Sequence, residues 1–446
     1  MKTKKNKLVL TSTLLSVALL AAITPAHAVV DLVVTNARAL LDKSQGKQAY
    51  DLLEPLEQTR AGDPDFDISL GIAANEAGEF SRAIFALERV LSVQPDNARA
   101  RAEMGRALFA VGDIKGARQV FQQTKDQGVP VEVAATLDQF LRAIDKIEQA
   151  GLSSWKAFAE VGLGNDTNIN SGPGVNSVAV PAFGGLVLTL NPGGVKTGAS
   201  FATAAVGASG RYVIDSRWSL IGNVATNWRG NSGGNSAFNT TQSDVTAGAS
   251  YIVERNDYSL VAQYSASGVG GTNVRNSTGV VGEWTYRFDG FRQITSYVQL
   301  GYLAYPLQGV RDATRNVIGS TYAHLFSNGL LAFGGLYFGA EKEKAAGVPH
   351  LGHKLSGLRL GTQKPINPSM ALFATLGWEG RNFGGVDPLF LVTRQDRQTS
   401  LNLGMTWSPA KDWRITPQIA LTRSSSNIVI NDYDKRMISI AARREF

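Results

Sequence analysis

The chain has 446 residues, of which 43% are hydrophobic and 47 are glycine, with no cysteine and a formal net charge of +7. The lack of cysteine excludes disulfides, thiol catalysis and cysteine metal sites. Four of the lysines lie within the first seven residues, so the positive charge gives no reason to expect a nucleic-acid partner.

The first 28 residues have the pattern of a cleaved secretory signal. Lys2, Lys4, Lys5 and Lys7 precede an apolar segment at 8–22, and Ala26-His27-Ala28 gives a small-x-small cleavage pattern. The apolar core is shorter than the roughly 20 residues of a spanning helix, which disfavours the alternative of a retained membrane anchor. No cysteine follows it, so the chain is not a lipoprotein. We predict an exported protein with 1–28 removed.

Residues 29–150 are predicted to form a tetratricopeptide-repeat domain of about three repeats. Similar residues recur at an interval of 34, which is the length of that repeat. The positions are Gly71 and Gly105, Gly78 and Gly112, Phe80 and Ile114, Leu87 and Phe121, and Ala49, Ala83 and Ala117, while Leu70, Ala74 and Pro95 also match the consensus. Small residues would let the paired helices approach closely, and Gly78 and Gly112 would form the turns.

Residues 131–150 are predicted to form one more amphipathic helix. Its apolar stripe consists of Val133, Leu137, Phe140, Leu141, Ile144 and Ile147. We expect this helix to cap the repeats and lead into the next domain, so that the stripe packs in a core. A groove for a partner is the alternative interpretation.

From Trp155 to Phe446 short runs alternate apolar and polar residues, as in strands with one apolar face. In one run Val280, Gly282, Trp284, Tyr286 and Phe288 alternate with Glu283, Thr285 and Arg287. A soluble sandwich would show the same alternation. The signal, the aromatic placement and the chain end favour a membrane barrel, whose closed sheet satisfies every backbone N–H and C=O in a bilayer.

The aromatic residues fit an outer-membrane barrel. All seven tryptophans lie at or after Trp155, and several stand near predicted strand ends with Tyr or Phe nearby, as in an interfacial girdle. Ile438, Ile440, Ala442 and Phe446 share one face of the last predicted strand. Such a terminal aromatic resembles the signal that the barrel-assembly machinery reads, so we predict that machinery as a partner and Phe446 as its signal.

Short and long connections alternate along 155–446. Short polar turns are predicted at 215–217, 254–257, 289–290, 328–329, 365–368 and 409–412, and long segments near 168–195, 230–240, 268–276, 305–313, 342–352, 382–394 and 424–432. Short turns face the periplasm in such barrels and long loops face outward. We therefore predict a fourteen-stranded antiparallel outer-membrane barrel at 155–446, with both ends and the repeat domain in the periplasm of a Gram-negative bacterium.

Support for catalysis is thin, and we predict no enzyme activity, no cofactor and no metal. His350 and His353 have a metal-binding spacing, but they lie in a predicted long loop without a nearby carboxylate or cysteine set. Residues 230–234 match the sequence pattern of a nucleophile elbow, but they lie in a glycine-rich loop. Asn165, Asp166, Asn168 and Asn170 could coordinate calcium, although Asx-type turn bonding is favoured.

Two stretches make the chain similar to the surface lipoprotein assembly modifier family. One is 162–170, with Gly164, Asn165, Asp166, Asn168 and Asn170, and the other is 423–435, with Asn427, Tyr433 and Asp434. The resemblance implies a type XI secretion translocon that moves client lipoproteins or soluble proteins from the periplasm to the cell surface. It implies periplasmic chaperones and outer-membrane lipid as further partners.

The residues leave other functions open. An exopolysaccharide exporter can also join tetratricopeptide repeats to a barrel, although its repeat arrays are usually much longer. A simple solute channel leaves the repeats unexplained, and a scaffold for periplasmic partners leaves the size of the barrel unexplained. The sequence carries no nucleotide-binding signature, so client folding, binding or partner proteins would have to drive transport.

Overall fold

The computed structural model describes residues 31–150 and 152–446, and the structural statements below concern these residues. The predicted signal at 1–28 lies outside them. The chain divides into two compact units, an N-terminal unit that ends at Ala100 and a C-terminal unit at 101–446. Each unit is described by itself.

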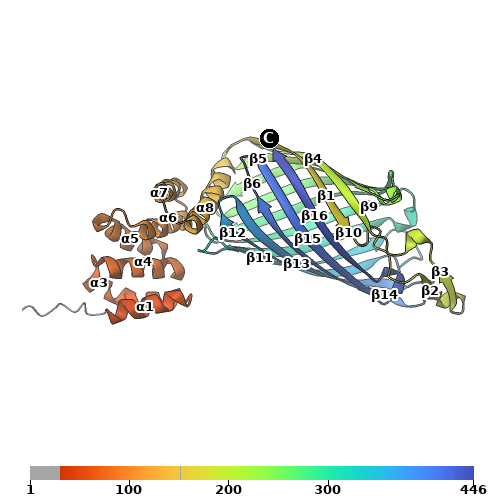
Figure 1. Ribbon diagram of the computed structural model, residues 1–446, viewed down its shortest axis with the longest axis horizontal. Coiled ribbons are helices and arrows are strands. Elements are labelled where there is room, and N and C mark those ends of the chain that lie inside the picture. The colour runs from red at the N-terminus through yellow and green to blue at the C-terminus, as the bar shows by residue number, and fades with distance from the viewer. Residues whose placement is uncertain (1–30, 151) are drawn as a thin grey trace, which may run out of the picture. The chain divides into compact units, whose positions relative to one another are not determined.

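The N-terminal unit consists of antiparallel helices that pack in sequence (Figure 1). Its elements are α1 (Leu32–Asp42), α2 (Gly46–Leu53), η1 (Glu54–Leu56), α3 (Glu57–Arg60), α4 (Pro64–Ala77) and α5 (Phe80–Val93). Two aspartates begin helices by accepting backbone N–H groups: Asp31 from Val33 and Val34, and Asp63 from Asp65 and Phe66. Such caps satisfy donors that have no partner within the helix.

The helical part continues into the C-terminal unit with α6 (Ala98–Val111), α7 (Ile114–Asp126) and α8 (Val131–Ala150). The middle of the apolar stripe of α8 is buried, since Leu137, Phe140 and Ile144 are at most 2% exposed, whereas Val133 and Ile147 are 39% and 43% exposed. The prediction that the stripe packs in a core is confirmed for its middle and not for its two ends. No helix among residues 31–150 or 152–446 is long and apolar enough to cross a membrane.

The rest of the chain is a closed antiparallel barrel of fourteen strands, as the sequence predicts. The strands are β1 (Ser154–Asp166), β4 (Ala199–Val213), β5 (Trp218–Asn231), β6 (Thr240–Val253), β7 (Asn256–Val269), β8 (Thr272–Arg287), β9 (Arg292–Ala304), β10 (Ala313–Leu325), β11 (Leu331–Glu343), β12 (His353–Asn367), β13 (Met370–Val386), β14 (Thr393–Trp407), β15 (Trp413–Ser426) and β16 (Tyr433–Glu445). Each strand pairs with its sequence neighbour, and β1 pairs with both β4 and β16.

The connections define two ends of the barrel. Short turns join β4 to β5, β6 to β7, β8 to β9, β10 to β11, β12 to β13 and β14 to β15, at what we call the short-turn end. The opposite, long-loop end carries the connection at 167–198, which contains a separate hairpin of β2 (Ser177–Val180) and β3 (Leu186–Thr189). Short 3-10 helices lie in these connections: η2 (Pro181–Phe183), η3 (Pro192–Gly194), η4 (Ser236–Phe238), η5 (Gly309–Arg311) and η6 (Val429–Asn431).

One predicted connection is wrong. The segment near 268–276 is not a long loop, because β7 runs to Val269, β8 starts at Thr272, and only Gly270 and Gly271 lie between them. Both glycines have positive φ, 59° and 82°, which a two-residue hairpin turn requires. The polar residues that follow indicate a loop by composition, but they are strand residues near the rim of a barrel.

The barrel wall has an apolar outer face and a polar inner face. Val280, Trp284 and Phe288 are each about 40% exposed on the outer face, and Glu283 and Thr285 alternate with them on the inner face. Trp155, Trp218, Trp407 and Trp413 stand at strand ends along the short-turn end, as an interfacial girdle requires.

Candidate functional site

The two stretches that carry the family resemblance meet where the barrel closes. The carboxylate of Asp166, at the end of β1, is fully buried and lies 2.9 Å from Nζ of Lys435 on β16 and 2.8 Å from Nη2 of Arg229 on β5. It also accepts the N–H of Asn168 at 2.9 Å. We call Asp166, Asn168, Arg229 and Lys435 the closure cluster. Its ion pairs join strands from both sides of β1.

Asn168 and Asn170 hold the ends of the 167–198 connection in place. Nδ2 of the fully buried Asn168 donates to the carbonyl oxygens of Gly172 and Asp434, each at 2.9 Å, and its Oδ1 accepts the N–H of Gly172. Nδ2 of Asn170 donates to the carbonyls of Gly193 and Val195. Both amides therefore serve as donor and acceptor in loop hydrogen bonds, which favours turn bonding over the calcium alternative.

A glycine next to this cluster makes room for an aromatic ring. A Cβ on Gly164 would collide with the ring of Phe201 and would lie 2.6 Å from the carbonyl oxygen of Ile438. The guanidinium of Arg229 is 3.9 Å from the centroid of that Phe201 ring. Gly164 thus allows the ring to support the arginine that pairs with Asp166.

The other family-motif residues make contacts of their own. Asn165 donates to the hydroxyl of Ser200 on β4, and Asp434 lies 2.7 Å from Nζ of Lys196. Asn427 accepts the N–H of Gln395 and donates to the carbonyl of Thr393, outside the closure cluster. Tyr433 stands opposite Ser424 in the β15–β16 ladder. The roles of these residues in the family remain predictions.

The closure also includes the chain end. The backbone N–H of Phe446 donates to the carbonyl of Ala157, and the N–H of Ala157 donates back to Phe446. Phe446 therefore adds a pair of hydrogen bonds to the β1–β16 ladder at the short-turn end. Its role as a signal for barrel assembly stays a prediction.

The inner wall across β10–β14 carries charges that are already paired. Arg315 pairs with Glu341, and Glu379 accepts hydrogen bonds from the Tyr337 hydroxyl at 2.7 Å and from Arg381 at 2.6 Å. Arg394 pairs with Asp396 at 2.7 Å. Each of these charges has a nearby opposite charge. Arg359 on the same wall instead lies over the Tyr337 ring, 5.2 Å from its centroid, and forms no salt bridge among the described residues.

The two histidines with metal-binding spacing belong to different elements. His353 is not in a loop but is the first residue of β12, where its ring lies 5.0 Å from that of Phe383, centroid to centroid. The strand begins at His353, so this residue is not part of the connection that holds His350. Within the described ranges no group of three or more His, Asp or Glu side chains could hold a metal ion. In the glycine-rich segment at 230–234, the first two residues end β5 and the other three lead toward η4.

The repeat residues occupy equivalent places in successive helical hairpins. A Cβ on Gly71 would lie 2.6 Å from the Leu87 side chain, and a Cβ on Gly105 would lie 2.5 Å from the Phe121 ring. The second pair lies 34 residues after the first. The other signature residues are arranged accordingly: Leu70, Ala74, Ala83, Ala117, Leu87 and Phe121 are buried, and Pro95 follows α5.

The turns repeat as well. Gly78 and Gly112 have φ of 85° and 91°, and Ser44, which stands 34 residues before Gly78, has φ of 57°. Left-handed conformation costs a residue with a Cβ more than it costs glycine. Sequence reasoning missed Ser44 because a serine gives no sign of this conformation, although the 34-residue interval points to it.

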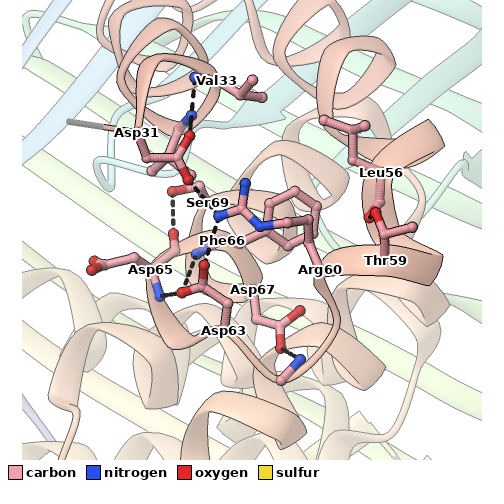
Figure 2. Close-up of polar contacts among 12 residues, drawn as sticks. Asp31, Val33, Leu56, Thr59, Arg60, Asp63, Asp65, Phe66, Asp67 and Ser69 are labelled. Carbon is pink, nitrogen blue, oxygen red and sulfur yellow. Dashed lines mark hydrogen bonds and ion pairs between the residues drawn. The ribbon is translucent and has the colours of Figure 1, made fainter. Parts of the chain in front are cut away.

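Ion pairs stabilise the N-terminal unit (Figure 2). Arg60 pairs with Asp31 and Asp63, which cap α1 and α4, and its guanidinium lies 5.0 Å from the Phe66 ring centroid. The fully buried Asp67 accepts hydrogen bonds from the N–H of Gly62 and from Arg89, at 2.6 Å for Nη2. These ion pairs join neighbouring helices of the N-terminal unit.

Within the C-terminal unit, the last helices share a core with the short-turn end of the barrel. Phe109, Phe121 and Phe140 pack with Phe291 from the β8–β9 turn, whose ring centroid is 5.5 Å from that of Phe109 and 5.8 Å from that of Phe140. The neighbouring Gly290 has no Cβ, and one there would lie 2.7 Å from the Phe109 ring. We call this group the aromatic anchor. It fixes α6–α8 to the barrel.

Comparisons with known proteins match both parts of the chain. The family model described as surface lipoprotein assembly modifier matches residues 155–446, and a tetratricopeptide-repeat model matches 74–138. The chain is similar to the hemophilin secretion modulator of Acinetobacter baumannii, with 22% identity over 85% of this chain and 78% of the relative. It is also similar to surface lipoprotein assembly modifier 1 of Haemophilus influenzae, with 21% identity over 90% of this chain and 82% of that one.

Among solved structures, the chain is similar to two outer-membrane proteins. One is a loop-deletion mutant of OmpT of Vibrio cholerae, with 8% identity, coverage of 66% of this chain and 99% of that one, and a TM-score of 0.38. The other is the outer-membrane channel DcaP of Acinetobacter baumannii, with 9% identity, coverage of 66% and 97%, and a TM-score of 0.39.

Proposed function

The chain belongs to the surface lipoprotein assembly modifier family, and on this premise we propose that it is an outer-membrane translocon that moves specific client proteins from the periplasm to the cell surface. The observation that carries the proposal is the aromatic anchor, which joins the end of a tetratricopeptide array to the short-turn end of a closed barrel. In this arrangement a client that binds the repeats is delivered at one end of the barrel and leaves at the other.

The proposal places the short-turn end and the repeats in the periplasm and the long-loop end outside the cell. Outer-membrane barrels have short periplasmic turns and longer extracellular loops. The repeats recruit the client, because a helical solenoid offers an extended surface to a partner. Periplasmic chaperones deliver the unfolded client, and the barrel-assembly machinery inserts the translocon itself.

Two classes of client fit the family. One relative is named for secretion of hemophilin and the other for assembly of surface lipoproteins. The client of this chain is therefore a lipoprotein or a soluble secreted protein. The ion pairs of the inner wall suit a moving polypeptide, because a segment can exchange hydrogen bonds with paired polar groups along the wall.

Deletion of the gene in its host tests the proposal. We expect one client protein to disappear from the surface, measured by protease shaving of intact cells and mass spectrometry, and to accumulate in the periplasm. Surface display of unrelated outer-membrane proteins serves as the control, and the full-length gene restores the client. Unchanged display of every protein together with loss of surface polysaccharide contradicts the proposal and supports the exopolysaccharide exporter.

A further inference from the structure

The outer face of the barrel near its long-loop end is charged on one side only. On β11–β16 (Figure 1) basic residues occupy outward-facing positions near this end: Lys342, Lys354, Arg397, Arg423 and Arg436. Each stands in the same alternation as an exposed apolar residue of its strand, as Arg397 does with Leu403 and Arg436 with Ile438. Their side chains therefore point to the membrane side of the wall.

The other strands have no charge at the corresponding positions. Outward-facing residues near the long-loop end of β1 and β4–β10 are neutral: Asn165, Ser200, Trp228, Thr241, Ala266, Asn276, Tyr302 and Thr314. The alternating pattern of these strands is otherwise the same. The basic residues therefore mark one sector of the wall, which we call the basic sector, and are not a general feature of the rim.

Most of the positive charge in this sector is uncompensated. Arg423 pairs with Asp432 at 2.7 Å, and the outward-facing Asp434 pairs with Lys196. Among the residues that the structure describes, none forms a salt bridge with Lys342, Lys354, Arg397 or Arg436, although all four are exposed. Arg436 also interacts electrostatically with the carboxylate of Asp434, which leaves Lys342, Lys354 and Arg397 as free cations among the described residues. Exposed cations at the edge of an apolar wall attract anionic groups of the membrane surface.

A groove on the same face lies beside one of these cations. It has a volume of about 270 Å³ and is lined by Ser356, Trp378, Gly380, Asn382, Gln395, Asp396 and Arg397. Gly380 leaves it open, because a Cβ there would come within 3.1 Å of the Trp378 ring. The carboxylate of the adjacent Asp396 is already bound to Arg394, so it does not neutralise Arg397. The groove thus joins an aromatic surface to a free guanidinium.

We propose that the basic sector is a binding site for a phosphorylated glycolipid, the lipopolysaccharide of the outer leaflet. Its sugar phosphates contact Lys354, Arg397 and Arg436, and an acyl chain lies against Trp378 in the groove. Arginine binds phosphate with two parallel hydrogen bonds, and a membrane-facing aromatic surface suits a lipid chain. The inference rests on the proposed orientation, in which the long-loop end faces the outer leaflet.

Binding of purified lipid A to the full-length protein tests the site. The variant Lys354→Gln/Arg397→Gln/Arg436→Gln removes three cations of the basic sector, and Arg217→Gln/Lys411→Gln/Arg444→Gln removes three at the short-turn end. Native mass spectrometry of delipidated protein in detergent measures binding. We expect the first variant to bind lipid A at least about tenfold more weakly than wild type, and the control variant to bind it as wild type does.

Two further probes separate phosphate recognition from general attraction. Lipid A without phosphates is expected to bind weakly to all three proteins, while phosphatidylglycerol binds the three alike. Equal lipid A binding by both variants overturns the proposal, as does an equal loss of lipid A and phosphatidylglycerol in the first variant. Heat-dependent migration on gels verifies that each barrel is folded. Client localisation is a separate measurement, so failure of the translocon proposal is distinguishable from failure of this one.

Discussion

Asp166 shows how a single buried carboxylate can control the closure of the barrel. Its side chain is fully buried, and it pairs with Arg229 and Lys435, which come from strands on different sides of β1. A buried carboxylate of this kind is stable only while its partners remain, and its partners depend on it in the same way. The effect of removing it should therefore exceed that of removing a surface ion pair.

We predict that Asp166→Asn lowers the stability of the barrel by roughly 3 kcal/mol, because it leaves two partly buried cations without their carboxylate. The measurement is the temperature at which the folded band disappears on heat-modified gels. Asp434→Asn is the matched control, since Asp434 and Lys196 are 40% and 32% exposed and their pair contributes about 1 kcal/mol or less. Equal shifts of this temperature in both variants would show that the buried ion pairs of Asp166 contribute no more to stability than the exposed pair of Asp434.

The sequence identifies some of these residues and misses others. Asp166 and Asn168 stand in a recognisable stretch, and Lys435 lies at the end of the second stretch. Arg229 gives no signal, because its pairing with Asp166 depends on the register of β5 against β4 and of β4 against β1. Register between strands is set by the whole sheet, so a residue that acts across two ladders cannot be found from local pattern.

At the scale of elements, the caps of α1 and α4 make the N-terminal unit sensitive to acid. The hydrogen bond from Arg60 is the largest of the effects that hold the pKa of Asp31 and of Asp63 below the ordinary value, and backbone N–H groups at the helix starts lower it further. A carboxyl whose pKa is lower in the folded state stabilises that state above its unfolded pKa. The contribution is lost as the pH falls through the folded pKa.

We predict that the helical melting temperature of the full-length protein falls as the pH is lowered from about 5 to about 3, measured by circular dichroism at the helical band. Arg60→Met should make the melting temperature less dependent on pH in this range, because the pKa of both carboxyls then returns toward the ordinary value. Arg99→Met removes a cation of the same unit that has no ion pair within the described ranges, and it should keep the wild-type dependence. If the melting temperature of Arg60→Met depends on pH as that of the wild type does, Arg60 is not the cause of the acid sensitivity.

The aromatic anchor gives the next prediction. Phe291→Ala removes the ring that the β8–β9 turn contributes to the core of α6–α8. Phe291 is partly buried, so its loss should cost less than the roughly 3 kcal/mol of a fully buried phenylalanine. We expect α7 and α8 to exchange amide hydrogens faster while the barrel strands do not. Hydrogen–deuterium exchange with mass spectrometry measures both in one experiment.

Phe288→Ala is the control for that measurement. Phe288 belongs to the same turn region but is 41% exposed on the outer face of the barrel. Its loss should leave exchange in α7 and α8 unchanged. Faster exchange of these helices in both variants would mean that the turn as a whole, and not the inserted ring, holds them.

The elements differ in how far the sequence determines them. The apolar stripe of the helix at 131–150 predicts burial, but Phe291 lies in a turn where composition indicates only a loop. The β7–β8 connection fails for a related reason, because the polar residues after Gly271 are typical of loops in soluble proteins. In a barrel the same residues suit strand positions near the polar rim, where no apolar face is needed.

At the scale of the whole molecule, the alternation of short and long connections predicts the strand count and the approximate place of every connection, although the segment near 268–276 is not a long loop. Some strands run further than predicted, since β12 reaches Asn367 and β13 reaches Val386. It follows from local composition and does not depend on contacts between distant residues. The 34-residue interval predicts the repeats for the same reason. The basic sector could not be predicted in this way, because it joins outward-facing residues of five strands that only the closed sheet brings near one another.

The orientation of the molecule can be tested directly, because the chain contains no cysteine. We predict that a cysteine at the exposed Ala346, in the β11–β12 connection, reacts with a membrane-impermeant maleimide on intact cells. Cysteines at the exposed Ala410, in the β14–β15 turn, and at the exposed Ala61, in the repeat domain, should react only after the outer membrane is permeabilised. Labelling is measured by the mass shift of the purified protein, and equal labelling in denaturant shows that each cysteine is present. If the Ala410→Cys variant reacts on intact cells, the short-turn end faces outward and the proposed orientation is wrong. The proposed direction of transport, and the leaflet that the basic sector contacts, would then be wrong as well.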